Sequence, residues 1–176
     1  MVKMKWNVSI LAADTNKSPA IAIVDAPASL HYKARKDVHR GLCCSVCYMP
    51  SGDILLGSTQ GITRLNSGLE FIKFSDMYRG VTDIVSYHHS LYVLHKRKGS
   101  KRVSQVSSDL SNGFTLFDIS TLNYVDKLSV SKRYIVMTDK CNNRLIAYDK
   151  STETLKDLTV PQAKSHEDVC FISDVS

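Results

Sequence analysis

Several features that mark common classes of protein are missing from this sequence. No apolar run approaches the roughly 18 residues that a membrane-spanning helix needs, so we expect no transmembrane segment. The apolar stretch before Asp14 is interrupted by Asn7 and Ser9, which makes it too short and too polar for a signal peptide. We therefore expect this stretch to form a core strand.

Catalytic motifs are missing as well. The sequence contains no G-x-S-x-G, no phosphate-binding loop and no H-E-x-x-H. His88 and His89 are adjacent, so on an extended backbone their side chains point to opposite faces and cannot share a metal ion. The run 165–168 places Ser, His, Glu and Asp side by side, whereas a catalytic triad is assembled by spatial convergence. We expect no enzymatic activity, no cofactor and no bound metal.

The five cysteines form neither a disulfide framework nor a zinc site by their spacing. An odd number cannot pair completely, which fits a reducing compartment and predicts a cytoplasmic protein. Cys44 and Cys47 are three residues apart, so on a strand they face opposite sides. Cys141 and Cys170 supply no second C-x-x-C. The thiols are expected to be buried and unreactive.

The composition is that of a folded protein with an excess of positive charge. Of the 176 residues, 43% are hydrophobic and 23% are charged, which excludes a wholly disordered chain. The net charge is +6, which mildly favours an acidic partner and leaves RNA possible.

Short strands separated by polar turns dominate the pattern. Runs rich in Val, Ile, Leu, Tyr and Thr alternate with turn segments such as 50–53, 66–68 and 111–113, and no stretch keeps a helical period for three turns. Short strands at close, regular spacing indicate an all-β sandwich, barrel or propeller.

An internal repeat decides among these architectures. Segments 52–66, 89–109 and 132–149 each contain a strand, a polar turn and a second strand, with a short apolar strand before and a weaker strand after. The repeat is about 40–45 residues long, which is the length of one four-stranded propeller blade.

We therefore predict an all-β protein, a β-propeller of four-stranded antiparallel blades that spans residues 1–176. The expected units are a part-blade at 5–36, blades at 43–76, 82–118 and 124–160, and the first strand of a further blade at 167–176. The part-blade lacks an innermost strand, so the chain either closes on itself with four blades or belongs to a six- or seven-bladed ring. We favour a segment of a six-bladed ring, because unpaired sheet edges need the remaining blades as partners.

One hairpin carries a family likeness. The stretch "IVMTDKCNNRLIAYDKS" (135–151), with Asp139, Asn143, Arg144 and Asp149, resembles an NHL repeat, and "PSGDILLGST" (50–59) is similar to another part of that repeat. Degenerate blades of this kind resemble the C-terminal propellers of tripartite-motif (TRIM) proteins. That resemblance implies the substrate-recognition end of a ubiquitin ligase, or an RNA regulator. The 176 residues contain no RING, B-box or coiled coil, so we expect no ubiquitin transfer from them.

The motif residues also have a purely structural explanation. Asp139 can accept hydrogen bonds from turn amides, and Asn143 tolerates the left-handed conformation that a tight hairpin requires. Arg144 can pair with an aspartate of its own blade or of a neighbouring one.

A basic stretch, "HKRKGSKR" (95–102), is our leading contact candidate. It is expected to be a long loop between the second and third strands of its blade. The loop either binds phosphate groups through its positive charge or is simply solvated. Its cations are Lys96, Arg97, Lys98, Lys101 and Arg102.

A second candidate surface lies in the expected links between blades. These segments mix aromatic and cationic side chains, as protein interfaces do, although we favour plain packing for the tyrosines and solvation for the charges. The candidates are Tyr32, Arg35, Arg40, Tyr78 and Arg79.

The sequence thus predicts an interaction module that recognises a protein, or alternatively RNA. A competing prediction is a calcium-dependent hydrolase, because some six-bladed propellers similar to gluconolactonase hold calcium in the central channel. Asp83, Asp126 and Asp168 recur once per blade near the start of the inner strand and could ring such a channel.

Overall fold

The computed structural model describes residues 8–14, 20–26, 31–37, 43–119, 125–139 and 141–158, with side chains from residue 43 onward. Every regular element in these ranges is a β-strand, and none is a helix that could cross a membrane. The expected strand at 167–176, with Asp168 and Cys170, lies outside the described residues, as does Arg40.

The strands form four antiparallel sheets, and in each sheet the strands follow one another in chain order. The first sheet has three strands: β1 (Val8–Asp14), β2 (Ala20–Ala26) and β3 (His31–Asp37). The second has four: β4 (Cys43–Tyr48), β5 (Ile54–Ser58), β6 (Ile62–Leu65) and β7 (Phe71–Ser75). The third comprises β8 (Val81–Tyr87), β9 (Ser90–Arg97), β10 (Ser100–Ser107) and β11 (Gly113–Asp118). The fourth comprises β12 (Val125–Val130), β13 (Tyr134–Asp139), β14 (Arg144–Asp149) and β15 (Thr154–Asp157).

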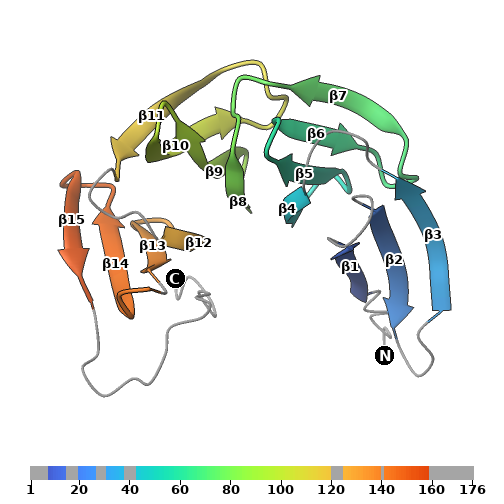
Figure 1. Cartoon of the computed structure of the whole chain (residues 1–176), viewed down its shortest axis with the longest axis horizontal. Helices are drawn as coiled ribbons and strands as arrows, with labels where there is room; N and C mark the ends of the chain where they lie inside the picture. The colour runs from blue at the N-terminus through green and yellow to red at the C-terminus, as the bar shows by residue number, and fades with distance from the viewer. Residues whose placement is uncertain are drawn as a thin grey trace, which may run out of the picture.

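The sheets fan out side by side as blades of a partial propeller (Figure 1). The first strands of the four-stranded blades, β4, β8 and β12, lie on the inside of the arc, and β7, β11 and β15 lie on the outside. This arrangement confirms the predicted all-β propeller class.

Apolar side chains fill the space between neighbouring blades. Successive residues on a strand point to opposite faces, so Leu91 and Val93 of β9 pack toward the β4–β7 blade while Tyr92 and Leu94 pack toward the β12–β15 blade. Each fully buried Leu or Val contributes about 1.5–3 kcal/mol relative to exposure. One blade therefore cannot cover its own apolar faces, and packing between blades holds the fold together.

The three inner strands share one irregularity. Each carries a β-bulge near its start, between Cys43 and Ser45, between Val81 and Asp83, and between Val125 and Lys127.

The bulges make Ser45, Asp83 and Lys127 the equivalent residues of the three blades. Our prediction that Asp126 repeats the position of Asp83 is therefore wrong. Asp126 is the bulged residue, and its counterpart in β8 is Thr82.

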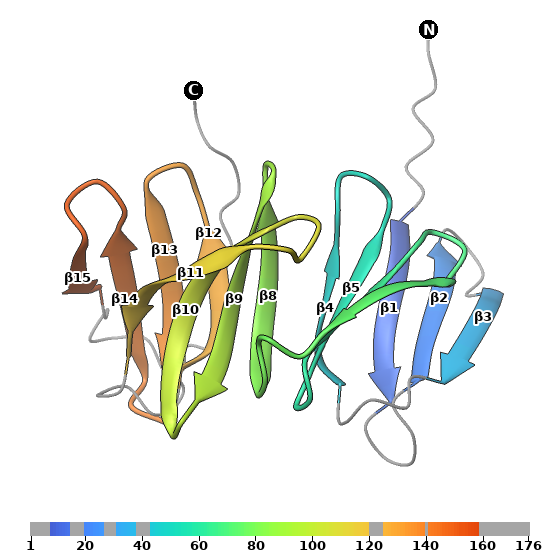
Figure 2. The same ribbon diagram turned by 90° about the horizontal axis from the view of Figure 1, so that it is seen from above.

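The propeller has two distinct ends, which Figure 2 shows above and below the strands. The described turns between second and third strands lie at one end, together with the link 76–80 between β7 and β8, because antiparallel strands alternate in direction. We call this the hairpin end. The turns between first and second strands, and between third and fourth strands, lie at the opposite end.

Candidate binding surface

The basic stretch is a hairpin rather than the long loop that we predicted. Its residues pair across β9 and β10, with His95 opposite Arg102, Lys96 opposite Lys101 and Arg97 opposite Ser100. Only Lys98 and Gly99 form the turn, with φ angles of 50° and 90°. Two successive residues with positive φ are typical of a type I′ turn, which suits the twist of a two-residue hairpin.

This hairpin extends farther from its blade than its neighbours do. By register, His95 occupies the position of Asp139 in β13, where the β13–β14 ladder ends. The β9–β10 ladder continues for two further residue pairs, which carries the tip roughly 7 Å farther out. In Figure 2 its turn reaches the lowest point of the described hairpins.

The five cations of the hairpin fall into two groups. Lys101 Nζ donates a hydrogen bond to the Val125 carbonyl at 2.5 Å and lies 3.5 Å from Asp126 Oδ1. Arg102 Nε donates to Asp118 Oδ2 at 3.0 Å.

Lys96, Arg97 and Lys98 are exposed, and no acidic group in the described part of the chain forms an ion pair with them. We call these three residues the cationic tip. They carry positive charge that is free to attract a ligand.

A neutral histidine lies beneath the tip. His95 is 2% exposed, and its Nε2 lies 2.8 Å from Ser104 Oγ. Burial, together with the positive charges of Arg102 and Arg97, lowers the pKa of His95 to about 4. The imidazole is therefore uncharged at neutral pH. In the next blade Asp139 occupies the same position, so the β9–β10 hairpin lacks the carboxylate that partly neutralises its neighbour.

The NHL-like residues build the β13–β14 turn. Asp139 is fully buried and accepts hydrogen bonds from the Asn142 backbone N–H, the Asn142 side chain and Arg144 Nη2. Asn143 adopts the left-handed conformation, with φ at 50°. Burial alone would raise the pKa of Asp139, but the hydrogen bonds from Asn142 and Arg144 lower it below its ordinary value. Arg144 thus pairs within its own blade.

Asp149, the last motif residue, caps the other end of the same hairpin. Its carboxylate accepts a hydrogen bond from Arg133 Nη2 at 2.8 Å and another from the Ser151 hydroxyl at 2.6 Å. These hydrogen bonds hold the pKa of Asp149 below its ordinary value. The contacts of Asp139, Arg144 and Asp149, and the backbone conformation of Asn143, therefore explain the four motif residues as turn architecture.

The link between the β4–β7 blade and the β8–β11 blade is only partly exposed. Tyr78 is 5% exposed and packs edge-on against the His95 ring, so our prediction of a contact role for it is wrong. Arg79 is exposed and pairs with Asp76 at 3.1 Å. Met77 is 53% exposed at the same end. The Gly80 carbonyl accepts a hydrogen bond from the Lys96 backbone N–H, which places this link beside the basic hairpin.

The other link candidates lie elsewhere. Tyr32 and Arg35 belong to β3, the outer strand of the first sheet, rather than to a link. Their side chains, like the whole of Arg40, are outside the described residues.

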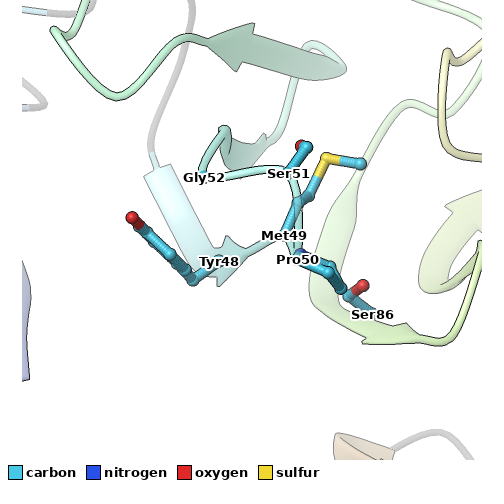
Figure 3. Close-up of a pocket in the computed structure, with 6 residues that line it drawn as sticks. All are labelled: Tyr48, Met49, Pro50, Ser51, Gly52 and Ser86. Atoms are coloured by element: carbon cyan, nitrogen blue, oxygen red, sulfur yellow. The ribbon is translucent and has the colours of Figure 1, made fainter. Parts of the chain in front are cut away.

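A hollow at the opposite end was not foreseen from the sequence. It is open, has a volume of about 530 Å³, and lies between the β4–β5 turn and the end of β8 (Figure 3). The residues lining it are Tyr48, Met49, Pro50, Ser51, Gly52 and Ser86. None of these described lining residues is charged, so they do not extend the basic surface.

A calcium site finds no support in the described residues, which contain no group of three or more His, Cys, Asp or Glu placed to hold a metal. Asp83 is 7% exposed and is already bonded: it accepts hydrogen bonds from Ser45 Oγ and from the Leu128 backbone N–H, both at 2.8 Å. Lys127 Nζ lies 4.0 Å from the same carboxylate. The role of Asp83 is to connect inner strands.

The thiols are only partly as predicted. Cys43 and Cys47 are buried, and burial raises the pKa of Cys47 to about 11, which leaves that thiol protonated and unreactive. Cys44 and Cys141 are exposed, so the expectation of uniformly buried cysteines is wrong. Cys44 and Cys47 do face opposite sides of β4, as their spacing requires.

Comparison with known proteins identifies the fold. No protein-family model and no curated protein matches the chain. Among solved structures, the WD40 repeats of RRP9 and the structure of U3-55K each match at 12% identity with a TM-score of 0.64. Each match covers 85% of this chain and 46% of the other.

An inactive variant of virginiamycin B lyase from Staphylococcus aureus matches at 9% identity with a TM-score of 0.61, over 86% of this chain and 55% of the other. The chain therefore spans about half the length of these structures. At such identities a likeness shows the fold alone, and the fold is a β-propeller.

Proposed function

We propose that this chain is a non-catalytic interaction module, a propeller scaffold that recognises a protein partner at its hairpin end. The observation that carries the proposal is the cationic tip. Lys96, Arg97 and Lys98 protrude beyond the neighbouring hairpins without acidic partners in the described residues. Uncompensated charges on a protruding element attract ligands of opposite sign, so the partner presents an acidic segment.

The surroundings of the tip favour a protein over RNA. Proteins that bind single-stranded RNA offer exposed aromatic side chains on which bases stack. The exposed aromatic residues in the described part of the chain are Tyr48, Phe71 and Phe114, and all three adjoin turns of the opposite end. The exposed residues of the link beside the hairpin are Met77, Arg79 and Asp76, the ion-pair partner of Arg79. Methionine and arginine are enriched at protein–protein interfaces.

The finer assignment rests on the resemblance to NHL repeats. The hydrogen bonding of Asp139 and Arg144, together with the fan of blades, supports an NHL-type propeller like those of TRIM proteins. In that setting the module would be the substrate-recognition end of a cytoplasmic ubiquitin ligase, completed by further blades. The WD40 structures that match the fold support a scaffold role by analogy. No observation favours the calcium-dependent hydrolase.

Charge reversal at the tip tests the proposal. Lys96→Glu/Lys98→Glu changes the net charge by the same amount as the control Lys132→Glu/Lys156→Glu, whose lysines are exposed elsewhere. The probes are a labelled Glu-rich peptide and a single-stranded RNA of equal charge. We expect the tip variant to bind the peptide about tenfold more weakly, because each exposed ion pair contributes about 0.2–1 kcal/mol and reversal adds repulsion.

The control variant should bind the peptide almost as the unmodified protein does. Equal losses in the two variants would show that net charge alone is responsible, which would overturn the proposed site. Tighter binding of the RNA than of the peptide would replace the protein partner by a nucleic acid.

A further inference from the structure

Two serines of the basic hairpin follow cations at the same spacing. Ser100 is preceded by Arg97 and Lys98, three and two residues earlier, and Ser104 is preceded in the same way by Lys101 and Arg102. Protein kinases select substrates partly by such charge patterns around the acceptor hydroxyl. The sequence makes the two serines equivalent substrates for a kinase that prefers basic residues, and the structure separates them.

Ser104 is inaccessible in the folded protein. It is 1% exposed on β10, between the buried residues Val103 and Val106, and its hydroxyl lies 2.8 Å from His95 Nε2. A kinase must hold the acceptor in an extended segment within its active site. Presenting Ser104 in this way would require unpairing β10 from the core of its blade.

Ser100 occupies the end of the hairpin. It is half-exposed and follows Gly99 directly, and a side chain added at Gly99 would meet no described atom within 4 Å. Backbone hydrogen bonds anchor the hairpin at Lys96, through Gly80, and at Lys101, through Ile119. The segment 97–100 lies beyond both anchors.

Segment 97–100 can open without disturbing the core. It is held by the pairing of Arg97 with Ser100, and the next pair inward places Lys96 opposite Lys101. Like charges directly opposite each other across two strands are destabilising. Local opening of such an exposed tip requires far less free energy than global unfolding.

We propose that Ser100 is a phosphorylation site for a kinase that recognises basic residues before the acceptor serine. The Ser100 hydroxyl oxygen attacks the γ-phosphorus of ATP, the bond to ADP breaks, and the hydroxyl proton passes to the kinase. The phosphate brings a charge of about −1.5 to −2 into the cationic tip. It lies opposite Arg97 across the hairpin, where it can form charge-assisted hydrogen bonds.

The modification has a consequence for binding. A phosphoserine at position 100 cancels much of the positive charge of the cationic tip and repels an acidic segment. Phosphorylation thereby acts as an off-switch for the partner. This consequence rests on the proposed function, whereas the modification itself does not.

The site is tested on the native chain with the catalytic subunit of cAMP-dependent protein kinase, ATP and Mg²⁺, followed by mass spectrometry of proteolytic fragments. We expect phosphate on Ser100 and none on Ser104. A synthetic peptide of residues 94–108 is the matched control, and it should be modified at both serines because nothing buries Ser104 there. Equal modification of both serines in the native chain would refute the structural distinction. A native chain that stays unmodified while the peptide is modified at Ser100 would overturn the site.

The switch is tested by measuring the affinity of the phosphorylated chain for the Glu-rich peptide, with Ser100→Ala treated by the same kinase as the control. We expect phosphorylation to weaken binding about tenfold, because a nearby phosphate both pairs the cations and repels carboxylates. Unchanged binding would refute the switch. If the unmodified chain does not bind the peptide at all, the proposed function fails while the modification at Ser100 is judged by its own assay.

Discussion

One carboxylate joins the inner strands of all three four-stranded blades, and its removal is a direct test of how the blades are held together. Asp83 on β8 accepts hydrogen bonds from Ser45 Oγ on β4 and from the Leu128 backbone N–H on β12. The Ser45 hydroxyl oxygen in turn accepts a hydrogen bond from the Ile84 backbone N–H at 3.0 Å. Replacing Asp83 by alanine breaks the connection on both sides.

The magnitude follows from the groups left behind. In Asp83→Ala the Leu128 N–H is buried without its acceptor, at about 1–3 kcal/mol, and a hydrogen bond between Ser45 and a charged group, worth about 1.5–3 kcal/mol, is also lost. Part of this loss is offset, because burial disfavours the ionised carboxylate and raises the pKa of Asp83. We expect the free energy of unfolding to fall by about 3 kcal/mol.

The neutral variant Asp83→Asn separates hydrogen bonding from charge. Asparagine keeps an oxygen that can accept from the Leu128 N–H, so it should cost no more than about 1.5 kcal/mol at neutral pH. The pKa of Asp83 is raised above its ordinary value on folding, so its contribution to stability is complete below its unfolded pKa. That contribution declines as the pH rises through the folded pKa. The advantage of the natural protein over Asp83→Asn should therefore be largest at acid pH.

Urea unfolding followed by circular dichroism between pH 3 and 7 measures these differences as free energies of unfolding. Asp76→Ala is the control, because Asp76 is exposed and pairs with Arg79 at the surface. It should lose less than about 1 kcal/mol. The reasoning is refuted if Asp83→Ala loses as little as the control, or if asparagine at position 83 is as damaging as alanine.

Two further substitutions test the hairpin and the link. Arg144→Met leaves the buried Asp139 without its cation and should lower the free energy of unfolding by about 2 kcal/mol at pH 7 in the same assay. The pKa of Asp139 is lowered on folding, so this deficit should disappear as the pH falls through the folded pKa, and a pH-independent deficit would contradict the pairing. Tyr78→Phe should be neutral or stabilising, because the buried Tyr78 hydroxyl has no hydrogen-bond partner among the described residues, whereas Tyr78→Ala should lose about 3 kcal/mol by forming a cavity. A clear loss in Tyr78→Phe would reveal a bond to the hydroxyl.

The blade architecture could be predicted because each of its signals is local. A short continuous apolar run such as Leu91–Leu94, bounded by polar turns and rich in β-forming residues, indicates a strand that is covered on both faces. The contacts of the β13–β14 turn were foreseeable for the same reason. Asp139, Asn143 and Arg144 are close in sequence, and the chemistry of a tight turn limits what each side chain can do.

Features that depend on register were not predictable from the sequence. Each inner strand has its bulge at the same place, and in β12 the aspartate is the bulged residue, whereas in β8 it is the residue after the bulge. Lys127 rather than Asp126 therefore lies beside Asp83, and the residues that follow the three bulges are Ser45, Asp83 and Lys127 instead of a ring of aspartates. The burial of Tyr78 likewise depends on contact with His95 from another segment of the chain. Spacing along the chain carries no information on either contact.

The basic stretch was predicted to be a loop for a related reason, and the hairpin found there shows how this blade differs from the next. Five cations in eight residues are typical of a solvated loop, yet Gly99 permits a two-residue turn, and the ladder continues to Arg97 and Ser100. At the position where β13 carries Asp139, β9 carries a neutral His95, while an arginine is retained on the third strand of both blades as Arg102 and Arg144. Extending the hairpin and removing its carboxylate both increase the positive potential at one place. Lys101 and His95 do contact neighbouring segments, through Val125 and Tyr78. The side chains of Lys96, Arg97 and Lys98 are exposed instead, which is why we assign the cationic tip a role in binding rather than in folding.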